Sequence, residues 1–179
     1  MTAPAAVPAR PLDAQVRPFI EAGAKVVDRT ADRVVLAHDS LRFATEFRMQ
    51  RMLLARIRHL RVSTVVPAMS GPGHDVTLRL RIHKSRTAGW ERGGIGPELH
   101  GPAVAKLVRT VDLTSFSATW HAENRTWLVQ IEPYAGAHLR VFFPPITYGI
   151  TLRGGEAATL IDALHETATV LTHHPGEPR

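Results

Sequence analysis

The sequence of 179 residues contains no cysteine. This absence excludes disulfide bonds, thiolate zinc sites, cysteine nucleophiles and iron–sulfur clusters. Aromatic residues make up only 6% of the chain, and no apolar run reaches the roughly 20 residues that a membrane-spanning helix needs. Lysine is scarce as well, with three among the 22 basic residues. The cationic side chains are therefore almost all arginines, whose planar guanidinium groups suit phosphate and carboxylate.

The basic residues are concentrated in one segment of the chain. Residues 41–92 contain 11 lysines and arginines and three acidic residues, a net charge of +8, whereas the rest of the chain carries −2. Such an asymmetry indicates an anionic partner, because a localised field attracts ligands of the opposite charge. Nucleic acid, an acidic lipid surface and an anionic metabolite all fit this description.

The length of 179 residues is typical of one domain. The Pro/Ala-rich residues 1–11 predict a disordered arm, residues 12–172 a single α+β domain, and residues 173–179 a disordered tail. The amino-terminal stretch lacks the apolar segment of a secretory signal, and the chain lacks cysteine, so a cytoplasmic location is expected. The sequence does not determine the oligomeric state.

The spacing of apolar residues predicts three helices, near residues 12–22, after Pro102 and over about 155–171. Alternation predicts strands over 25–29, 33–38, 76–82, 116–122 and 127–131, with further strands near 139–143 and 146–152. Hairpins interspersed with helices favour an α+β fold, an antiparallel sheet of about six to eight strands with three helices. The order helix, hairpin, long strand occurs twice, which is compatible with two pseudo-repeats.

Residues 41–60 fit two patterns. As a strand, Phe43 and Phe47 alternate with polar residues, and as a helix, Met49, Leu53 and Ile57 fall on one face. A strand is favoured because the β-branched residues 61–66 continue it. A basic amphipathic helix in this segment would instead be a candidate for docking to a membrane surface or a partner helix.

Arginines on strand faces form the first candidate site. Arg56 and Arg58 share one face of a strand, and Arg79, Arg81 and His83 share one face of the next. If these strands pair across the turn at residues 70–75, the side chains lie together and can neutralise several phosphates. The basic strands lack interleaved aromatic residues for base stacking. The competing interpretation is a solvated face whose arginines pair with the protein's own carboxylates.

The hairpin over residues 116–132 carries the second candidate site. A two-residue turn at Asn124-Arg125 predicts Trp120 opposite Val129, with His121 and Glu132 on the polar face. A histidine near a carboxylate is the minimum for general acid–base chemistry. The competing interpretation is an ordinary solvated face, because the outward side of a hairpin is polar by default.

The sequence lacks several other motifs that are typical of functional sites. None of the ten histidines occurs at a spacing typical of metal ligands, so no metal site is expected. The loop Gly93-Gly94-Ile95-Gly96 lacks the Lys-Ser/Thr of a phosphate-binding P-loop, and there is no dinucleotide-binding fingerprint or Gly-x-Ser-x-Gly elbow. No cofactor is therefore expected.

Short aromatic and proline motifs characterise the carboxyl-terminal half. These are Gly89-Trp90, Pro133-Tyr134, Phe143-Pro144-Pro145 and Tyr148, followed by the predicted last helix. The pattern resembles a small uncharacterised bacterial family without an assigned activity. The resemblance implies an α+β domain and supplies no catalytic residue.

The leading hypothesis is a binding module that docks an anionic partner, with nucleic acid first and an acidic lipid surface second. The docking surface would be an arginine-rich sheet face formed by Arg56, Arg58, Arg79, Arg81 and His83. The alternative is a small cofactor-independent enzyme or ligand-binding fold, in which arginine holds an anionic metabolite and His121 with Glu132 moves a proton. The sequence leaves open whether the protein is an enzyme, because no motif in it specifies a reaction.

Overall fold

A computed structural model describes residues 11–82, 88–92, 99 and 101–173. Within these residues lie three helices, α1 (Pro11–Glu21), α2 (Pro102–Thr110) and α3 (Gly154–His173), as the apolar spacing predicts. The first helix ends where Gly23 takes a positive φ of 97° and Ala24 donates a backbone hydrogen bond to Phe19. The two predicted disordered ends fall largely on residues 1–10 and 174–179, outside the described residues.

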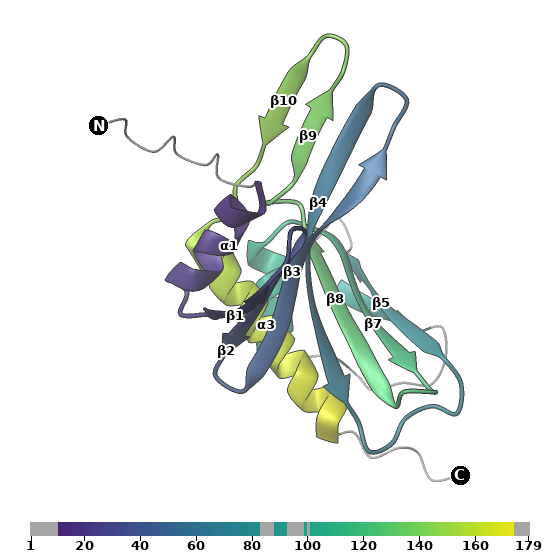
Figure 1. The fold of residues 1–179 in the computed structure, drawn as a ribbon. Coiled ribbons are helices and arrows are strands. Elements are labelled where there is room, and N and C mark those ends of the chain that lie inside the picture. Colours follow the sequence, from purple (N-terminus) through teal and green to yellow (C-terminus); the bar gives the residue numbers. More distant parts are fainter. Residues whose placement is uncertain (1–10, 83–87, 93–98, 100, 174–179) are drawn as a thin grey trace.

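The described residues also form ten strands, which pair in one antiparallel sheet of order β1-β2-β3-β4-β8-β7-β5-β6 (Figure 1). The remaining two strands, β9 and β10, form a hairpin that pairs with β4 through β9. The strands are β1 (Lys25–Arg29), β2 (Arg33–His38), β3 (Leu41–Arg51), β4 (Ala55–Pro67), β5 (Val76–Ile82), β6 (Ala88–Arg92), β7 (Leu113–His121), β8 (Thr126–Pro133), β9 (His138–Val141) and β10 (Ile146–Gly149). The predicted α+β class is confirmed.

The number of strands exceeds the expected six to eight for two local reasons. Residues 41–66 form two strands, β3 and β4, because the chain reverses at Met52–Ala55, where the Met52 N–H donates to the Ala55 carbonyl at 2.9 Å. Residues 88–92 form β6, a strand that the sequence analysis does not predict. The strand interpretation of residues 41–60 is thereby confirmed, and the turn within it lacks the usual Gly, Pro, Asn or Asp.

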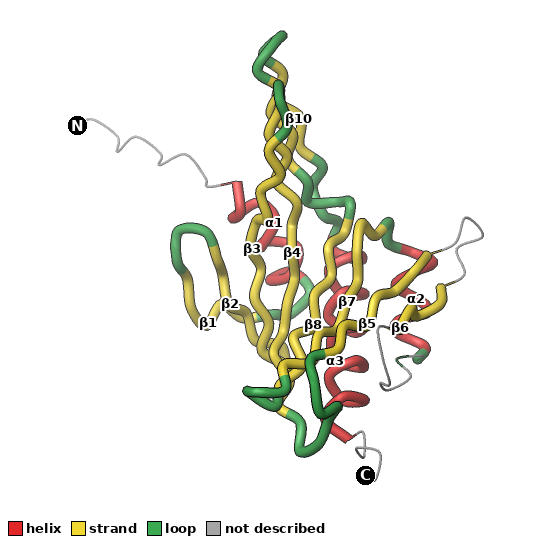
Figure 2. The backbone as a smooth tube through the Cα atoms, turned by 90° about the vertical axis from the view of Figure 1, so that its right-hand side faces the viewer, coloured by secondary structure: helices red, strands yellow, loops and turns green. Residues whose placement is uncertain are grey.

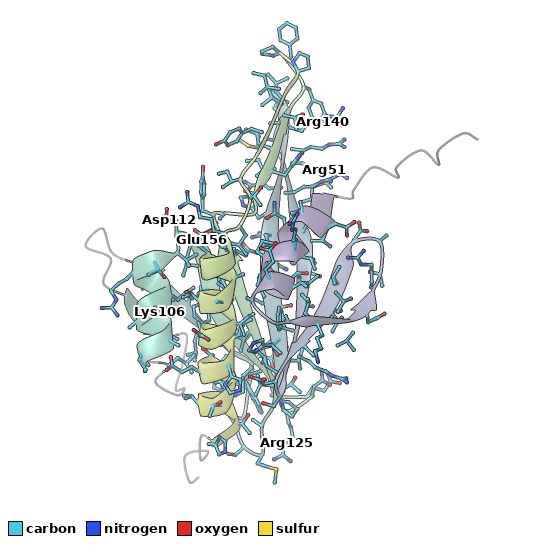
Figure 3. The ribbon with its side chains drawn as sticks, turned by 90° about the vertical axis from the view of Figure 1, so that its left-hand side faces the viewer. Arg51, Lys106, Asp112, Arg125, Arg140 and Glu156 are labelled. Carbon is cyan, nitrogen blue, oxygen red and sulfur yellow. The ribbon has the colours of Figure 1, made fainter. Side chains whose placement is uncertain are left out.

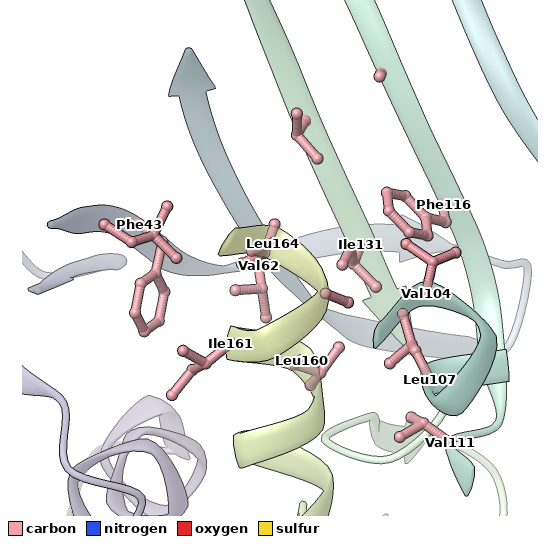
Figure 4. Close-up of a cluster of buried hydrophobic side chains, with 14 of the residues drawn as sticks. Phe43, Val62, Val104, Leu107, Val111, Phe116, Ile131, Leu160, Ile161 and Leu164 are labelled. Carbon is pink, nitrogen blue, oxygen red and sulfur yellow. The ribbon is translucent and has the colours of Figure 1, made fainter. Parts of the chain in front are cut away.

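All three helices lie on the same side of the sheet (Figure 2). In the core, Leu160, Ile161 and Leu164 of α3 lie over Val62 of β4 and Ile131 of β8 (Figure 4). These five side chains are at most 3% exposed. Burial of such side chains removes apolar surface from water, which is the main favourable term in folding. The helices and the sheet face that they cover therefore form one packed unit, which is called the body of the protein. The opposite face of the sheet is free of helices in the described part.

The carboxylate of Glu166 in α3 holds the amino-terminal end of α2. It accepts hydrogen bonds from the backbone N–H groups of Ala103 and Val104, at 3.2 and 2.9 Å. These donors belong to the first turn of α2, where no carbonyl within the helix can accept them. The contact satisfies two otherwise free donors and joins the two helices.

A tight passage after β8 connects the body to the β9–β10 hairpin. Gly136 has a φ of 88°, and its N–H donates to the Ile150 carbonyl at 2.7 Å. A Cβ atom built on Gly136 would lie 2.7 Å from the Cβ of Leu60, closer than a carbon–carbon contact allows. Glycine is therefore required here both by the backbone conformation and by the space available.

The register of the β7–β8 hairpin differs from the prediction. His121 pairs with Thr126 across a four-residue turn, so Trp120 faces Trp127 and not Val129. The two tryptophan rings lie 5.4 Å apart, and Asp75 accepts a hydrogen bond from the Ala122 N–H in the turn. The strand order also differs between the expected repeats, since β1–β2 lies at an edge of the sheet and β7–β8 lies between β4 and β5.

Candidate anion-binding surface

Two hairpins project together from one end of the sheet (Figure 1). They comprise residues 49–58 of β3 and β4 with their turn, and residues 138–149 of β9 and β10 with theirs, and together they are called the β-extension. Residues 55–58 of β4 pair with β9, whereas residues 62–67 of the same strand pair with β8. The β-extension is thus a four-stranded continuation of the main sheet, in the order β3-β4-β9-β10.

One face of the β-extension carries all four of its arginines. The register places Arg51 opposite Arg56 and Arg56 opposite Arg140, so these three form one row across three adjacent strands. Arg58 lies two residues further along β4, opposite His138 on β9. Adjacent strands are about 4.8 Å apart, and Figure 3 shows Arg51 and Arg140 close together on one side of the β-extension. The four positive charges are therefore gathered on a small surface.

Among the described residues, these arginines have no carboxylate partner. The β-extension contains no acidic residue, and no described carboxylate lies within 4 Å of Arg51, Arg56, Arg58 or Arg140. Arg61 is the opposite case, because it pairs with Glu132 at 2.8 Å and with Glu46 at 3.7 Å. In the described part of the chain, the protein's own carboxylates thus neutralise Arg61 but not the four arginines of the β-extension.

Phe142 positions two of the guanidinium groups. The Arg56 Cζ lies 5.3 Å from the centroid of the Phe142 ring, and the Arg140 Cζ lies 6.0 Å from it. The Phe142 N–H also donates to the Leu54 carbonyl at 2.9 Å, which joins the turns of the two hairpins. A cation–π contact orients a guanidinium group without neutralising it. Arg56 and Arg140 are therefore oriented with their charge still available.

The structure separates the two groups of arginines that the sequence analysis combines. β4 and β5 are not neighbours, because the β7–β8 hairpin lies between them. Arg79 is exposed on the helix-free face, opposite Ser117, whereas Arg56 and Arg58 lie on the other face. The expectation of one shared surface across the 70–75 turn is therefore wrong. The side chain of Arg81 and the whole of His83 lie outside the described residues.

His121 and Glu132 lie at opposite ends of the β7–β8 ladder. His121 pairs with Thr126 and Glu132 with Ser115, and positions 115 and 121 are six residues apart on β7. This separation is about 20 Å along a strand, so the two side chains do not form an acid–base pair. The Nδ1 of His121 lies instead 4.0 Å from the Asp75 carboxylate.

Glu132 is buried within a charged network on the helix-free face. It is 3% exposed and accepts hydrogen bonds from the Arg61 Nε and Nη2, at 2.9 and 2.8 Å, and from Arg48 at 3.4 Å. Burial by itself raises the pKa of the Glu132 carboxyl, but the hydrogen bond and charge of Arg61, the charge of Arg48 and a hydrogen bond with Ser115 outweigh it. The pKa therefore lies below its usual value, and the carboxylate stays ionised at neutral pH.

Glu132→Gln is expected to destabilise the fold by about 2–3 kcal/mol near neutral pH, because it leaves Arg61 and Arg48 without their buried carboxylate. A carboxyl whose pKa is lowered by folding stabilises the protein above its unfolded pKa of about 4.3, and this contribution is lost as the pH falls through the folded-state pKa. The difference between wild type and variant should thus shrink on acidification, as measured by urea unfolding at several pH values. The exposed Glu123→Gln is the control, and an unchanged difference down to about pH 3 would contradict the assignment.

Sequence reasoning missed Arg51, Arg140 and the aromatic Phe142 as members of one surface. Arg51 lies inside the basic segment 41–92 and Arg140 lies outside it, and the pairing of β4 with β9 that brings them together is not visible in the sequence. One signal was present nevertheless. Residues 47–74 and 133–155 are both free of aspartate and glutamate, and the two hairpins of the β-extension come from these two stretches.

In the part of the chain that the structure describes, no three His, Cys, Asp or Glu side chains are grouped so that they could hold a metal ion. None of the helices in that part is long and apolar enough to cross a membrane.

The fold and the surface together define an α+β protein whose antiparallel sheet continues into a cationic extension. Residues 17–171 match DUF3156, a family described as a protein of unknown function, and the chain belongs to this family. The match confirms the resemblance to an uncharacterised family and covers far more than the carboxyl-terminal half. No curated protein and no solved structure gives a significant match.

Proposed function

We propose that the protein is a binding module that docks an anionic partner through the four arginines of the β-extension. The observation that carries the proposal is their arrangement on one face with no carboxylate partner among the described residues. Two unit charges 4 Å apart in water repel each other by about 1 kcal/mol. An anion placed between neighbouring guanidinium groups turns this repulsion into attraction and adds charge-assisted hydrogen bonds.

This surface keeps part of the one expected from the sequence. Arg56 and Arg58 belong to it, and Arg51 and Arg140 take the place of Arg79 and Arg81. The excess charge of residues 41–92 supports the proposal, because three of the four arginines come from that segment. Arg140 is added to them by the β4–β9 pairing.

The alternative, an enzyme acting on an anionic metabolite, has less support. Its two proton-transferring residues, His121 and Glu132, lie about 20 Å apart on the β7–β8 ladder. Glu132 is already occupied by Arg61 and Arg48. The arginines of the β-extension lie on a projecting part of the sheet, which favours docking to a large surface over enclosure of a small molecule.

The proposal is tested by titrating the intact chain with DNA, RNA, anionic vesicles and neutral vesicles at about 50 mM and about 200 mM salt. Binding to at least one anionic ligand is expected, with little binding to neutral vesicles. Four contacts to DNA phosphates would weaken binding about 100-fold over this change in salt, because each contact releases condensed counterions. If none of the anionic ligands binds in a salt-dependent way, the proposal is wrong.

A further inference from the structure

The β-extension concentrates exposed apolar side chains as well as charge. Eight of the 14 large apolar side chains that are exposed in the described residues belong to it. They are Met49, Met52, Leu53, Leu54, Phe142, Phe143, Ile146 and Tyr148. Scattered exposed apolar residues are ordinary, but a contiguous group of them indicates a surface that is covered by a partner.

Most of this apolar surface lies at the far end of the β-extension. The two turns there have the sequences Met-Leu-Leu-Ala at residues 52–55 and Phe-Phe-Pro-Pro at residues 142–145, with no charged or hydrogen-bonding side chain. The hydrogen bond from the Phe142 N–H to the Leu54 carbonyl joins the turns into one tip. Leu53 is 96% exposed and Phe143 is 79% exposed. These two side chains therefore present bare hydrocarbon to water.

We infer that the anionic partner is an acidic phospholipid bilayer, into which the turns at residues 52–55 and 142–145 insert while the four arginines bind lipid phosphates. This inference rests on the proposed docking function and names its partner. It follows from the order of the two kinds of side chain along the β-extension, in which the apolar residues of the turns lie nearer to the tip than the arginines. Leu53 lies two residues beyond Arg51, and Phe143 lies three residues beyond Arg140.

The dimensions agree with such an arrangement. Two to three residues of an extended strand span about 7–10 Å, and apolar faces of interfacial segments enter the boundary between headgroups and acyl chains by about 5–10 Å. When Leu53 and Phe143 reach that depth, the guanidinium groups of the arginine row lie at the level of the phosphates. Phe142 and Tyr148 then lie at the interface, where aromatic rings are favoured.

A nucleic acid explains the arginines but leaves the tip unexplained. Single-stranded partners use aromatic platforms for stacking, whereas Leu53, Leu54 and Met52 are aliphatic and would remain in water. A second copy of the chain could cover the apolar side chains, but it would bring another four arginines against the first four. Only an anionic and apolar partner satisfies both features at once.

The test uses the absence of cysteine from the chain, which makes any introduced cysteine a unique labelling site. The variant Leu53→Cys is labelled with an environment-sensitive fluorophore and mixed with phosphatidylcholine vesicles that contain about 30% phosphatidylserine. A blue shift and quenching by a bilayer-embedded quencher are expected. The matched control is Met69→Cys, which is 85% exposed and lies beyond the opposite end of β4, where Arg125 contacts its carbonyl; its fluorescence should not change.

A second variant tests the contribution of the tip to affinity. Replacing Leu53 and Phe143 by serine should weaken binding to these vesicles about 100-fold, because two large side chains no longer enter the apolar phase. Both side chains are exposed, so the fold should be retained, as checked by circular dichroism. RNA binding, if any is measured, should not change.

The outcomes separate the inference from the proposed function. Vesicle binding without a signal from the Leu53 label overturns insertion and leaves anionic docking in place. Binding to RNA without binding to anionic vesicles overturns the choice of partner and again leaves docking in place. The absence of binding to any anionic ligand overturns both.

Discussion

A variant without the four arginines of the β-extension is expected to bind anionic vesicles about 1,000-fold more weakly than the wild type. A basic residue close to an acidic membrane surface contributes about 1 kcal/mol, and four of them contribute about 4 kcal/mol, which corresponds to about three powers of ten in affinity. The substitutions are Arg51→Gln, Arg56→Gln, Arg58→Gln and Arg140→Gln. The measurement is vesicle co-sedimentation over a range of lipid concentrations.

The matched control removes the same number of charges from the body of the protein. Its substitutions are at exposed arginines that form no side-chain ion pair with the described side chains, namely Arg33→Gln, Arg42→Gln, Arg79→Gln and Arg153→Gln. Because long-range attraction is screened over about 8–10 Å, this variant should lose less than about 10-fold in affinity. Equal losses in the two variants would show that net charge and not the arginine row determines binding.

Gly136→Ala is expected to lower the free energy of unfolding by about 3 kcal/mol. A positive φ costs a residue with a Cβ roughly 1–2 kcal/mol, and overpacking a filled site typically costs a further 1–3 kcal/mol. Both terms apply, because Gly136 has a φ of 88° and its added Cβ would lie 2.7 Å from the Cβ of Leu60. Thermal unfolding should show a midpoint lower by roughly 10 °C for a chain of this size.

The control for this substitution is Gly155→Ala in the first turn of α3. A Cβ atom on Gly155 would meet nothing within 4 Å, and the residue has no positive φ. Alanine there should be neutral or stabilise the protein by up to about 1 kcal/mol, since it restricts the unfolded chain and favours helix. A comparable loss of stability in both variants would show that the positive φ and the crowding at Gly136 are not responsible.

Local patterns were sufficient to predict most of the secondary structure. The apolar spacing in residues 155–171 predicts α3, and the alternation around Trp120 and Trp127 predicts the β7–β8 hairpin. Both predictions succeed because burial of one face gives the apolar residues of each helix or strand a characteristic spacing along the chain. The turn between β3 and β4 was not predicted. Its residues Met52 and Leu53 carry no turn signal, because neither is one of the Gly, Pro, Asn, Asp or Ser residues that favour turns.

The candidate surface could be predicted only in part, because it depends on which strands are neighbours. Arg56 and Arg58 share a face through the two-residue period of one strand, which the sequence contains. Arg140 joins them only because β9 pairs with the first part of β4, a contact between residues 80 or more positions apart. The loss of Arg79 from this surface has the same cause, since the β7–β8 hairpin occupies the place beside β4 that β5 was expected to take.

β4 belongs to both parts of the molecule, and this has a mechanical consequence. Its 13 residues contain no glycine and pair along almost their whole length, with β9 at one end and β8 at the other. An uninterrupted strand of this length spans about 43 Å and has no hinge at which the body could swivel. A partner that binds the outer end of β4 therefore also determines the orientation of the helices and of the helix-free face of the sheet, and their distance from that partner.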